Sequence, residues 1–386
     1  MKLKDIKQIK NLTGKRVLLR LDLNVPIEKG EVPNSGTWRL ERAIPTIKYL
    51  TRKKARVIIV AHLGRPEGKV MSEFTMQPVC EKLSQMLGKT IEFWADDFSG
   101  YIQDSEEMSN GSVAMIENIR FYREKKNCKR LATRLSKLAD IYVNDAFGNV
   151  HRQDASMHAI TYYLPSYAGL LMTDEVNYLS KVLKTKKGLS VILGGAKVAT
   201  KIKLIEKFSK MADHVCLGGI LANTMLKALD YKVGKSVYDK DFLALAKRAY
   251  NAKKVHLPED LVVCKNKKSK NCQTVEMDKI PAGMMSLDLG PKTIKKYLAE
   301  IKAAKLIVWN GPFGYFENKL FVQGSKSMMK GLVKLPAKVI IGGGETVELA
   351  NQLKLSKEFT FVSTGGGAML AFLQGNKLPS LERLKK

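Results

Sequence analysis

The run Leu189-Ser190-Val191-Ile192-Leu193-Gly194-Gly195-Ala196-Lys197 joins a short apolar segment to two glycines and a lysine, and a helix-forming stretch follows it. A strand that ends in glycines before a helix exposes backbone N–H groups and the positive end of the helix dipole, which suit a phosphate. One such turn is weak evidence, because tight strand-to-helix connections use glycine in any case. Apolar runs end in glycine four more times in the second half of the chain, at residues 218–219, 310–314, 342–346 and 363–367. Five such turns on one sheet favour a site for nucleotide phosphates.

The first half of the chain repeats the alternation of apolar run, loop and helix-forming stretch, but its apolar runs end in charged residues. These ends fall at residues 22–26, 62–66, 117–121 and 144–148. Nearly continuous apolar runs separated by longer amphipathic segments indicate parallel strands with helices on both faces. Because right-handed crossovers place the carboxyl ends of such strands at one edge, where ligands bind, several cations could converge there on one anion. The candidates are Arg20, Arg39, His62, Arg65, Arg120 and Arg152.

Length and periodicity predict the α/β class, with two doubly wound, Rossmann-like lobes built on parallel sheets. A chain of 386 residues is long enough for about two domains. We expect residues 1–168 to form the first lobe, residues 169–184 an interdomain helix and residues 185–372 the second lobe. The tail, residues 373–386, follows the last glycine turn and must pack against another part of the chain.

The apolar segments and the cysteines exclude several classes of protein. No apolar stretch approaches the roughly 18–20 residues of a membrane span, and the N-terminus lacks the apolar core of a signal peptide. The five cysteines are scattered, odd in number and without a C-x-x-C pair. We therefore expect reduced thiols in a cytoplasmic protein with no membrane partner, and neither a zinc nor a disulfide framework built from them.

The formal net charge of +29 could attract nucleic acid or an anionic membrane surface. Much of the excess is lysine spread along helix-forming stretches and loops, as in residues 265–270 and at the end of the chain. The sequence contains no zinc-finger or ribonucleoprotein motif. We therefore expect no specific nucleic-acid partner, and we attribute any binding of polyanions to a side effect of the charge.

Seven of these segments together resemble phosphoglycerate kinase. Residues 20–26, 62–66, 117–121 and 144–148 are similar to its substrate-side motifs, and residues 194–198, 309–312 and 363–368 to its nucleotide side. The match covers essentially the whole chain, in order and with plausible spacing. The resemblance implies reversible transfer of the acyl phosphate of 1,3-bisphosphoglycerate to Mg-ADP, giving 3-phosphoglycerate and ATP, as in glycolysis and gluconeogenesis. It also implies a monomer whose C-terminal tail returns to the first lobe.

On the substrate side, the resemblance implies a set of residues that hold 3-phosphoglycerate. A small molecule with a phosphate and a carboxylate calls for several fixed guanidinium groups. Arg39 would also face the transferred phosphoryl group. The alternatives are surface or interlobe salt bridges for single arginines, and structural roles for His62 and His151. The set is Asp22, Asn24, Arg39, His62, Leu63, Gly64, Arg65, Arg120, His151 and Arg152.

On the nucleotide side, Lys197 and Lys201 lie four residues apart at a helix start, so both project on one face. By resemblance Lys201 contacts nucleotide phosphates and Lys197 neutralises the phosphoryl group in transfer, which needs no covalent intermediate or general base. The alternative is two solvated helix lysines. The resemblance assigns Glu317 to the ribose, glycines to the adenine pocket, and residues 343–346 to phosphate and Mg²⁺, with Glu345 as metal ligand. The full set is Gly195, Ala196, Lys197, Lys201, Gly218, Gly219, Gly290, Asn310, Pro312, Glu317, Gly343, Gly344, Glu345 and Thr346.

The chain departs from the family pattern at several positions. Glu345 stands where the family usually has Asp, and this longer carboxylate can still reach Mg²⁺ if its loop shifts slightly. Asp154 replaces a histidine, so it either reduces the positive field or pins Arg152 in a salt bridge. Ile220 replaces a glycine beside the base pocket, and Thr200 replaces an acidic residue at the helix start. A different nucleotide-dependent phosphotransferase and a nucleic-acid-binding protein without catalysis remain the alternative functions.

In-line transfer also predicts motion, because substrates held on separate lobes must approach within a few ångströms. We expect hinge closure driven by both substrates together, with bending at residues 165–169, 186–188 and 364–367.

Overall fold

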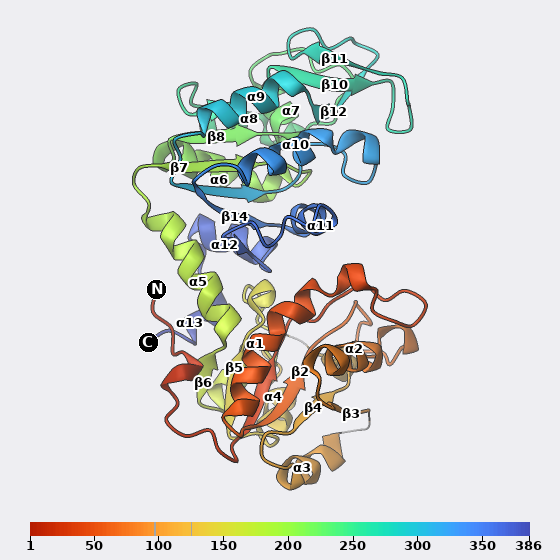
Figure 1. The fold of residues 1–386 in the computed structure, drawn as a ribbon, viewed down its shortest axis with the longest axis vertical. Coiled ribbons are helices and arrows are strands. Elements are labelled where there is room, and N and C mark those ends of the chain that lie inside the picture. The colour runs from red at the N-terminus through yellow and green to blue at the C-terminus, as the bar shows by residue number, and fades with distance from the viewer. Residues whose placement is uncertain (96–97, 125) are drawn as a thin grey trace. The chain divides into compact units, whose positions relative to one another are not determined.

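The computed structural model describes residues 1–95, 98–124 and 126–386. The chain forms two compact units, the first comprising Met1–Asn177 with Lys377–Lys386 and the second Tyr178–Asn376. Helix α5, Leu170–Lys184, contains the boundary between them (Figure 1). No helix in the described ranges is long and apolar enough to cross a membrane.

The first unit is built on a six-stranded sheet in the order β3-β4-β2-β1-β5-β6, in which every neighbouring pair is parallel. Its strands are β1 Arg16–Arg20, β2 Arg56–Val60, β3 Glu92–Trp94, β4 Val113–Ile116, β5 Ile141–Asn144 and β6 Ser166–Ala168. Its helices are α1 Trp38–Arg52, α2 Gln77–Leu87, α3 Phe98–Glu107 and α4 Lys129–Ser136. These elements give the predicted alternation of strand and helix.

Alternate residues of each central strand face different cores, so both faces of this sheet are buried. In β1, Val17 and Leu19 belong to a cluster that includes Leu40 and Ile47 of α1. Leu18, between them, belongs to the opposite cluster with residues of α3 and α4. Burial on both faces explains why the sequence of β1 is apolar without alternation.

Local sequence signals set the ends of α2. Pro78 lies in its first turn, where a missing N–H costs nothing. Gly88 ends the helix in the left-handed conformation, with φ 66°. The two residues therefore mark the start and the end of α2.

The second unit contains a parallel six-stranded sheet in the order β15-β14-β13-β7-β8-β9. Its strands are β7 Leu189–Leu193, β8 His214–Leu217, β9 Val255–His256, β13 Leu306–Asn310, β14 Lys338–Gly342 and β15 Phe361–Val362. Its helices are α6 Val198–Met211, α7 Gly219–Ala228, α8 Leu243–Ala249, α9 Pro291–Glu300, α10 Gln323–Leu332, α11 Gly344–Gln352 and α12 Gly367–Gln374. The two parallel sheets confirm the predicted α/β class.

The second unit also contains a three-stranded antiparallel sheet that the sequence analysis did not predict. Its order is β11-β10-β12, with β10 Asp260–Cys264, β11 Cys272–Glu276 and β12 Met285–Leu289. The lysine-rich residues 265–270, interpreted from sequence only as a charged loop, connect β10 to β11.

The expectation that all five cysteines are reduced is wrong in this hairpin. Cys264 and Cys272 lie directly opposite each other in the β10–β11 register and form a disulfide, with their Cα atoms 4.5 Å apart. Strand pairing brings together two cysteines eight residues apart in sequence, a spacing that resembles no local cysteine motif. Cys80, Cys128 and Cys216 are free.

The C-terminal tail packs in the first unit. Its helix α13, Pro379–Glu382, is followed by an antiparallel bridge between Lys385 and Leu3. Ser380 Oγ donates a hydrogen bond of 2.9 Å to the Arg152 carbonyl. The tail therefore holds the backbone of one of the predicted substrate residues.

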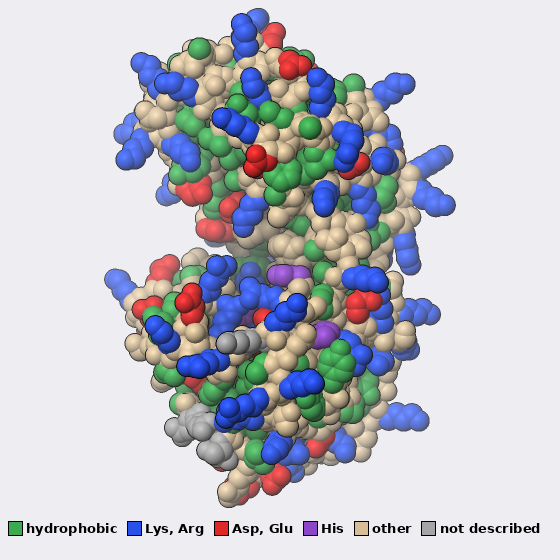
Figure 2. All heavy atoms as spheres, turned by 180° about the vertical axis from the view of Figure 1, so that it is seen from behind, with side chains coloured by type: hydrophobic (Ala, Val, Ile, Leu, Met, Phe, Trp, Pro, Cys, Tyr) green, Lys and Arg blue, Asp and Glu red, His purple; other side chains and the backbone are tan. Residues whose placement is uncertain are grey.

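The positive charge is distributed widely. Figure 2 shows Lys and Arg side chains over both units on the face drawn, with fewer Asp and Glu side chains among them.

Candidate functional site

Most of the residues predicted to bind an anion in the first unit lie after the carboxyl ends of its parallel strands, whereas Arg20 ends β1 itself and Arg39 lies in α1. Asp22 and Asn24 follow β1, and His62 follows β2. Arg120 lies in a short helix, Ile119–Tyr122, after β4, and Arg152 follows β5. Because these strands are parallel neighbours, their carboxyl ends share one edge of the sheet.

Hydrogen bonds from two side chains to the Gly64 backbone fix the loop after His62. The Asn24 side-chain oxygen accepts from the Gly64 N–H at 2.9 Å, and Arg120 Nη1 donates to the Gly64 carbonyl. Gly64 has φ +58°, and a Cβ there would lie 2.3 Å from the Phe74 ring. Glycine is therefore required, and the preceding Leu63 is buried. The two residues give this edge of the sheet a fixed backbone.

His62 is a buried, neutral histidine supported by Arg20. Its side chain is almost inaccessible, and its Nδ1 lies 3.1 Å from Arg20 Nη2. A guanidinium can only donate, so Nδ1 accepts and the proton of the neutral ring is on Nε2. Burial is the main cause of a His62 pKa well below the usual range, and neighbouring positive charges lower it further. These charges are Arg20, Arg120, Arg152 and Arg39.

Arg20 does not face the ligand edge as a free cation. It is 1% exposed, and its Nε donates to Ser156 Oγ at 2.9 Å. Its role is to hold the His62 ring.

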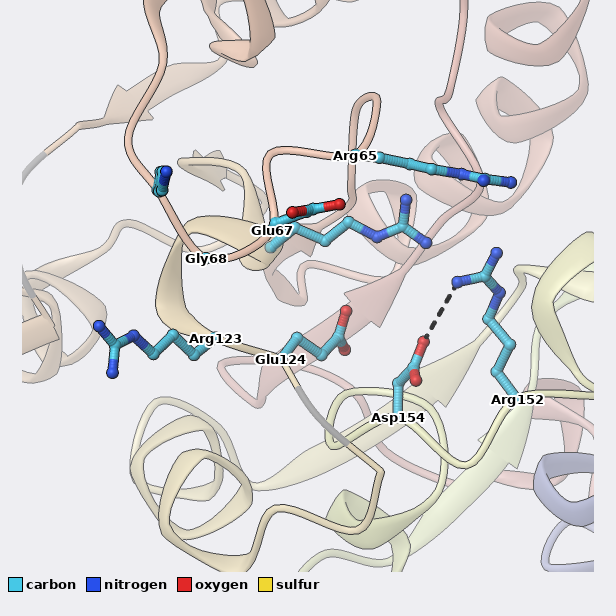
Figure 3. A pocket seen from close by; sticks show the side chains of 9 residues that line it. Arg65, Glu67, Gly68, Arg123, Glu124, Arg152 and Asp154 are labelled. Atoms are coloured by element: carbon cyan, nitrogen blue, oxygen red, sulfur yellow. Dashed lines mark ion pairs between the residues drawn. The ribbon is translucent and has the colours of Figure 1, made fainter.

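A cavity of about 610 Å³ opens beside these residues (Figure 3). Five cationic and three acidic side chains line it, so positive charge is in excess. In Figure 3, Arg65 and Arg152 extend toward the same region, whereas the guanidinium of Arg123 points away from it. The lining residues are Arg65, Glu67, Gly68, Lys69, Arg120, Arg123, Glu124, Arg152 and Asp154.

Five lining residues were missed from sequence, namely Glu67, Gly68, Lys69, Arg123 and Glu124. All of them lie within three residues after the two motifs at residues 62–66 and 117–121. Motifs extended to residues 69 and 124 would have contained all five.

Two arginines in this region are already paired with carboxylates. Asp154 forms an ion pair with Arg152 at 3.8 Å, which selects the salt-bridge interpretation of this departure from the family pattern. Arg39 Nη1 pairs with Asp22, and its guanidinium lies 4.8 Å from the centroid of the Trp38 ring. His151 is exposed. Of the predicted substrate set, only Arg65, Arg120 and Arg152 line the cavity. The predicted residues that do not line it are Asp22, Asn24, Arg39, His62, Leu63, Gly64 and His151.

In the second unit, three helices begin at one cavity of about 670 Å³. Residues before or in the first turns of α6, α11 and α12 line it. Helix N-termini present free N–H groups and positive dipole ends, so this arrangement suits a polyphosphate. It brings together nine of the predicted nucleotide residues: Gly195, Ala196, Lys197, Lys201, Asn310, Gly343, Gly344, Glu345 and Thr346.

Two glycines at this cavity allow a close approach of backbone segments. Gly311 lies in the predicted nucleotide-side motif 309–312, although it was not assigned a contact, and it has φ +91°. A Cβ there would lie 2.4 Å from the Gly194 carbonyl oxygen and from Lys201 Nζ. Gly343, with φ +96°, precedes α11. Larger residues would push the β13 and β14 loops away from Lys201.

Lys201 is buried, which excludes the alternative of a solvated helix lysine. Only 6% of it is exposed, and Nζ donates to the carbonyls of Gly194 and Asn310. Burial lowers its pKa to about 8; Glu345 acts against this shift and Lys197 adds to it. Lys197, at the N-cap of α6, is exposed. The Lys201 side chain is therefore fixed in the interior, whereas Lys197 is exposed to solvent.

A smaller cavity of about 200 Å³ is also lined by Gly195, and its mostly apolar walls suit a base. Among the predicted residues, Gly195, Ala196, Gly219, Pro312, Glu317 and Glu345 line it, as does Ile220. The residues missed from sequence are Asn223, Val237, Lys267, Met285, Ser286, Leu287, Phe313, Gly314, Tyr315 and Phe316. Three of these belong to β12 of the antiparallel sheet, which the sequence analysis did not predict.

Two predicted glycines have other neighbours. A Cβ on Gly290 would lie 2.3 Å from Asp260 Cγ, and one on Gly218 would lie 2.2 Å from the Phe313 ring. Neither glycine lines the small cavity. Both are needed for packing, so their predicted contact with the base lacks support from this geometry.

Comparison with known proteins gives consistent results. The family model described as phosphoglycerate kinase matches residues 5–376. A phosphoglycerate kinase of Pelotomaculum thermopropionicum is 41% identical over 384 residues, covering 97% of each chain. One of Borrelia garinii is 38% identical over 395 residues, covering 100% of each chain.

Solved structures agree with these sequence relatives. A phosphoglycerate kinase structure from Coxiella burnetii superposes with a TM-score of 0.86 at 35% identity, covering 99% of each chain. One from Pyrococcus horikoshii gives a TM-score of 0.87 at 30% identity, covering 99% of this chain and 98% of the other.

Proposed function

This chain belongs to the phosphoglycerate kinase family, whose members transfer phosphate to and from a carboxyl group, and we propose that each of its two units binds a different substrate. The first unit would bind 3-phosphoglycerate or 1,3-bisphosphoglycerate, and the second ADP or ATP. The observation that carries this division is the buried Lys201 at a cavity where three helices begin. It contrasts with the arginine cluster around neutral His62 in the first unit.

In the first unit, Arg65, Arg120 and Arg152 would bind the carboxylate and phosphate of the substrate through forked hydrogen bonds. His62 would donate from Nε2, because Arg20 occupies its Nδ1. Asn24 would act by holding the Gly64 backbone. These five residues combine fixed geometry with excess positive charge.

In the second unit, the phosphates would lie at the N-termini of α6, α11 and α12, and Lys201 would contact them. The base would occupy the smaller cavity, with Ile220 narrowing the wall where the family has glycine. Glu317 also lines that cavity and would accept hydrogen bonds from the ribose. A bound phosphate would raise the pKa of Lys201 and so keep it charged.

Glu345 has the properties that a Mg²⁺ ligand needs. Its carboxylate supplies hard oxygen atoms, and it lies in the first turn of α11, where it lines both cavities. Its charge raises the pKa of Lys201, which supports a position near the cavity where the phosphates would bind. We propose that it holds Mg²⁺ together with nucleotide phosphates. When bound, Mg²⁺ would neutralise charge that develops on the transferring phosphoryl group.

Phosphoryl transfer itself would depend on Arg39 and Lys197. Their charges would stabilise the phosphoryl group between donor and acceptor oxygens, with no general base. Asp22 would set the direction of the Arg39 guanidinium through their ion pair. In-line transfer requires the two bound substrates to come together, so we propose closure of the units when both are present.

A coupled assay tests this function directly. The purified chain, supplied with 3-phosphoglycerate, ATP and Mg²⁺, should produce 1,3-bisphosphoglycerate at a rate that depends on all three. Arg65→Ala should raise the KM for 3-phosphoglycerate more than about tenfold and leave the KM for ATP nearly unchanged. Exposed Arg130 on α4 provides a matched control as Arg130→Ala. ATP binding without turnover would contradict the proposal.

We further propose that the chain acts in the cytoplasm, and that it is a monomer because each proposed substrate site is lined by residues of one unit of a single chain. Light scattering of the purified protein should then give a mass near 43.1 kDa. A doubled mass would contradict the monomer.

A further inference from the structure

Three potential metal ligands meet in the second unit, in residues that the kinase reaction does not use. His214 begins β8, His256 ends β9 and Glu300 ends α9. One ligand atom from each lies within 4.8 Å of the other two. The three residues come from three different elements of the fold, so their convergence is tertiary and not a feature of one helix or loop.

The separations between these atoms are close to those in a tetrahedral zinc site. His214 Nδ1 lies 2.9 Å from His256 Nε2 and 3.7 Å from Glu300 Oε2. Zinc–ligand bonds of about 2.0–2.1 Å place tetrahedral ligands roughly 3.3 Å apart. Small rotations of partly exposed side chains, at 28% for His214 and 37% for Glu300, would complete the geometry. The fourth position would be open to water.

The surroundings favour a cation. His214 Nδ1 and His256 Nε2 face each other at 2.9 Å, so two imidazole nitrogens are available as ligands once they carry no proton. Glu300 lies at the negative end of the α9 dipole, where a carboxylate is unfavourable without a nearby cation. The nearby ammonium of Lys296 pairs with Glu259 at 3.0 Å. A divalent ion would take both imidazole nitrogens and the carboxylate as ligands.

Backbone contacts hold the ligands in place. The Tyr297 hydroxyl lies 3.0 Å from the His256 carbonyl and 2.7 Å from the Leu217 carbonyl. It therefore ties β9 to β8 from α9, beside Glu300. The His214–His256 hydrogen bond alone would account for the pairing of the rings, but not for the carboxylate directed at the same atom.

We propose that His214, His256 and Glu300 bind one Zn²⁺, or another divalent ion that prefers imidazole, as a structural site. Mg²⁺ is excluded as the natural occupant because it prefers oxygen ligands and retains water. The ion would fasten the edge strand β9, only two residues long, to β8 and to the end of α9. The site is distinct from the nucleotide cavities, since His214 is at the start of β8 and the glycine turn follows its end.

Isothermal titration of Zn²⁺ into the full chain, without nucleotide, tests the proposal. We expect one strong site per chain and no comparable Mg²⁺ binding. His256→Gln and Glu300→Gln should each weaken zinc binding more than about tenfold. His158→Gln is the matched control, because His158 lies in the first unit, where its Nδ1 contacts Asn127. Unchanged affinity in both ligand variants would overturn the proposal.

Hydrogen exchange of the unaltered protein provides a second measurement that does not depend on the folding of a variant. Saturating Zn²⁺ should slow exchange in peptides covering β9 and the end of α9, with no comparable slowing in β15, at the other edge of the sheet. Equal exchange in β9 with and without Zn²⁺ would overturn the site. Turnover with Mg-ATP should be unchanged in His256→Gln, which separates this site from the kinase reaction.

Discussion

Lys201→Met tests whether the protein keeps a charged side chain in its interior for nucleotide binding. Burial lowers the pKa of Lys201 from 10.5 to about 8. At about 1.36 kcal/mol per pKa unit, holding the protonated ammonium in the folded state costs about 3 kcal/mol at neutral pH. Methionine has a similar length and carries no such cost.

The direction of the pH effect follows from the two pKa values. Below pH 8 Lys201 is protonated in both the folded and unfolded states, so the full cost is present. Between pH 8 and 10.5 the folded protein has lost this proton while the unfolded chain still binds it. The contribution of Lys201 to the free energy of unfolding therefore becomes more favourable as pH rises through this window.

Urea unfolding at pH 7 and pH 9.5 measures the effect. The difference in free energy of unfolding between Lys201→Met and the unaltered chain should shift by about 2 kcal/mol in favour of the unaltered chain at pH 9.5. Subtracting the two proteins at each pH cancels the contributions of other titrating groups. Comparing the two pH values then cancels the constant cost of the lost hydrogen bonds to Gly194 and Asn310. Lys203→Met, an exposed residue on the same helix, should show no such shift.

Activity should change in the opposite sense. For the unaltered protein, kcat/KM for nucleotide should fall above about pH 8, where free Lys201 loses its proton. Lys201→Met should lower this value more than about tenfold at pH 7 and lack that alkaline decline. An identical stability difference at both pH values, or full activity in Lys201→Met, would refute the reasoning.

Three further predictions follow from the site. Arg39→Ala and Lys197→Ala should each lower kcat more than about tenfold with less effect on nucleotide affinity, because their charges act during transfer. A large loss of nucleotide affinity in Arg39→Ala would contradict the assignment of Arg39 to the 3-phosphoglycerate side. Asp154→Asn frees Arg152 from an ion pair whose side chains are 36% exposed for Arg152 and 20% for Asp154, so the pair contributes at most about 1 kcal/mol, and the KM for 3-phosphoglycerate should fall about two- to fivefold. An increased KM would show instead that Asp154 helps to orient Arg152. Asp230→Asn, which breaks a surface ion pair with Lys247, is the control. Small-angle scattering should show the smallest radius of gyration with both substrates bound, and equal values with neither, one and both ligands would remove closure from the mechanism.

The parallel sheets could be predicted because their signals are local. Each apolar run and its terminal turn lie within about ten residues, and burial on both faces of the sheet removes any need for alternation. The antiparallel sheet of β10, β11 and β12 depends on pairing between short strands separated by variable loops. Its disulfide, Cys264–Cys272, was missed for the same reason.

The positions of site residues in the fold were predictable where a motif fixes the backbone, and less so where side-chain direction decides. The sequence places Arg20 at a strand end, but only packing shows that it turns inward to hold His62. Lys197 and Lys201 have the same helical spacing from sequence, yet one is exposed and the other buried. Gly290 resembles a pocket glycine, but its neighbour is Asp260. Burial and side-chain direction are tertiary properties that local spacing does not encode.

The division of substrates between the two units is tested most directly by calorimetric titration of 3-phosphoglycerate and of ADP, each alone, into three proteins. These are the unaltered chain, Arg65→Ala and Lys201→Met. We predict that Arg65→Ala loses more than about tenfold in affinity for 3-phosphoglycerate and binds ADP normally, while Lys201→Met shows the reverse. Loss of ADP binding in Arg65→Ala with 3-phosphoglycerate binding intact would contradict the account.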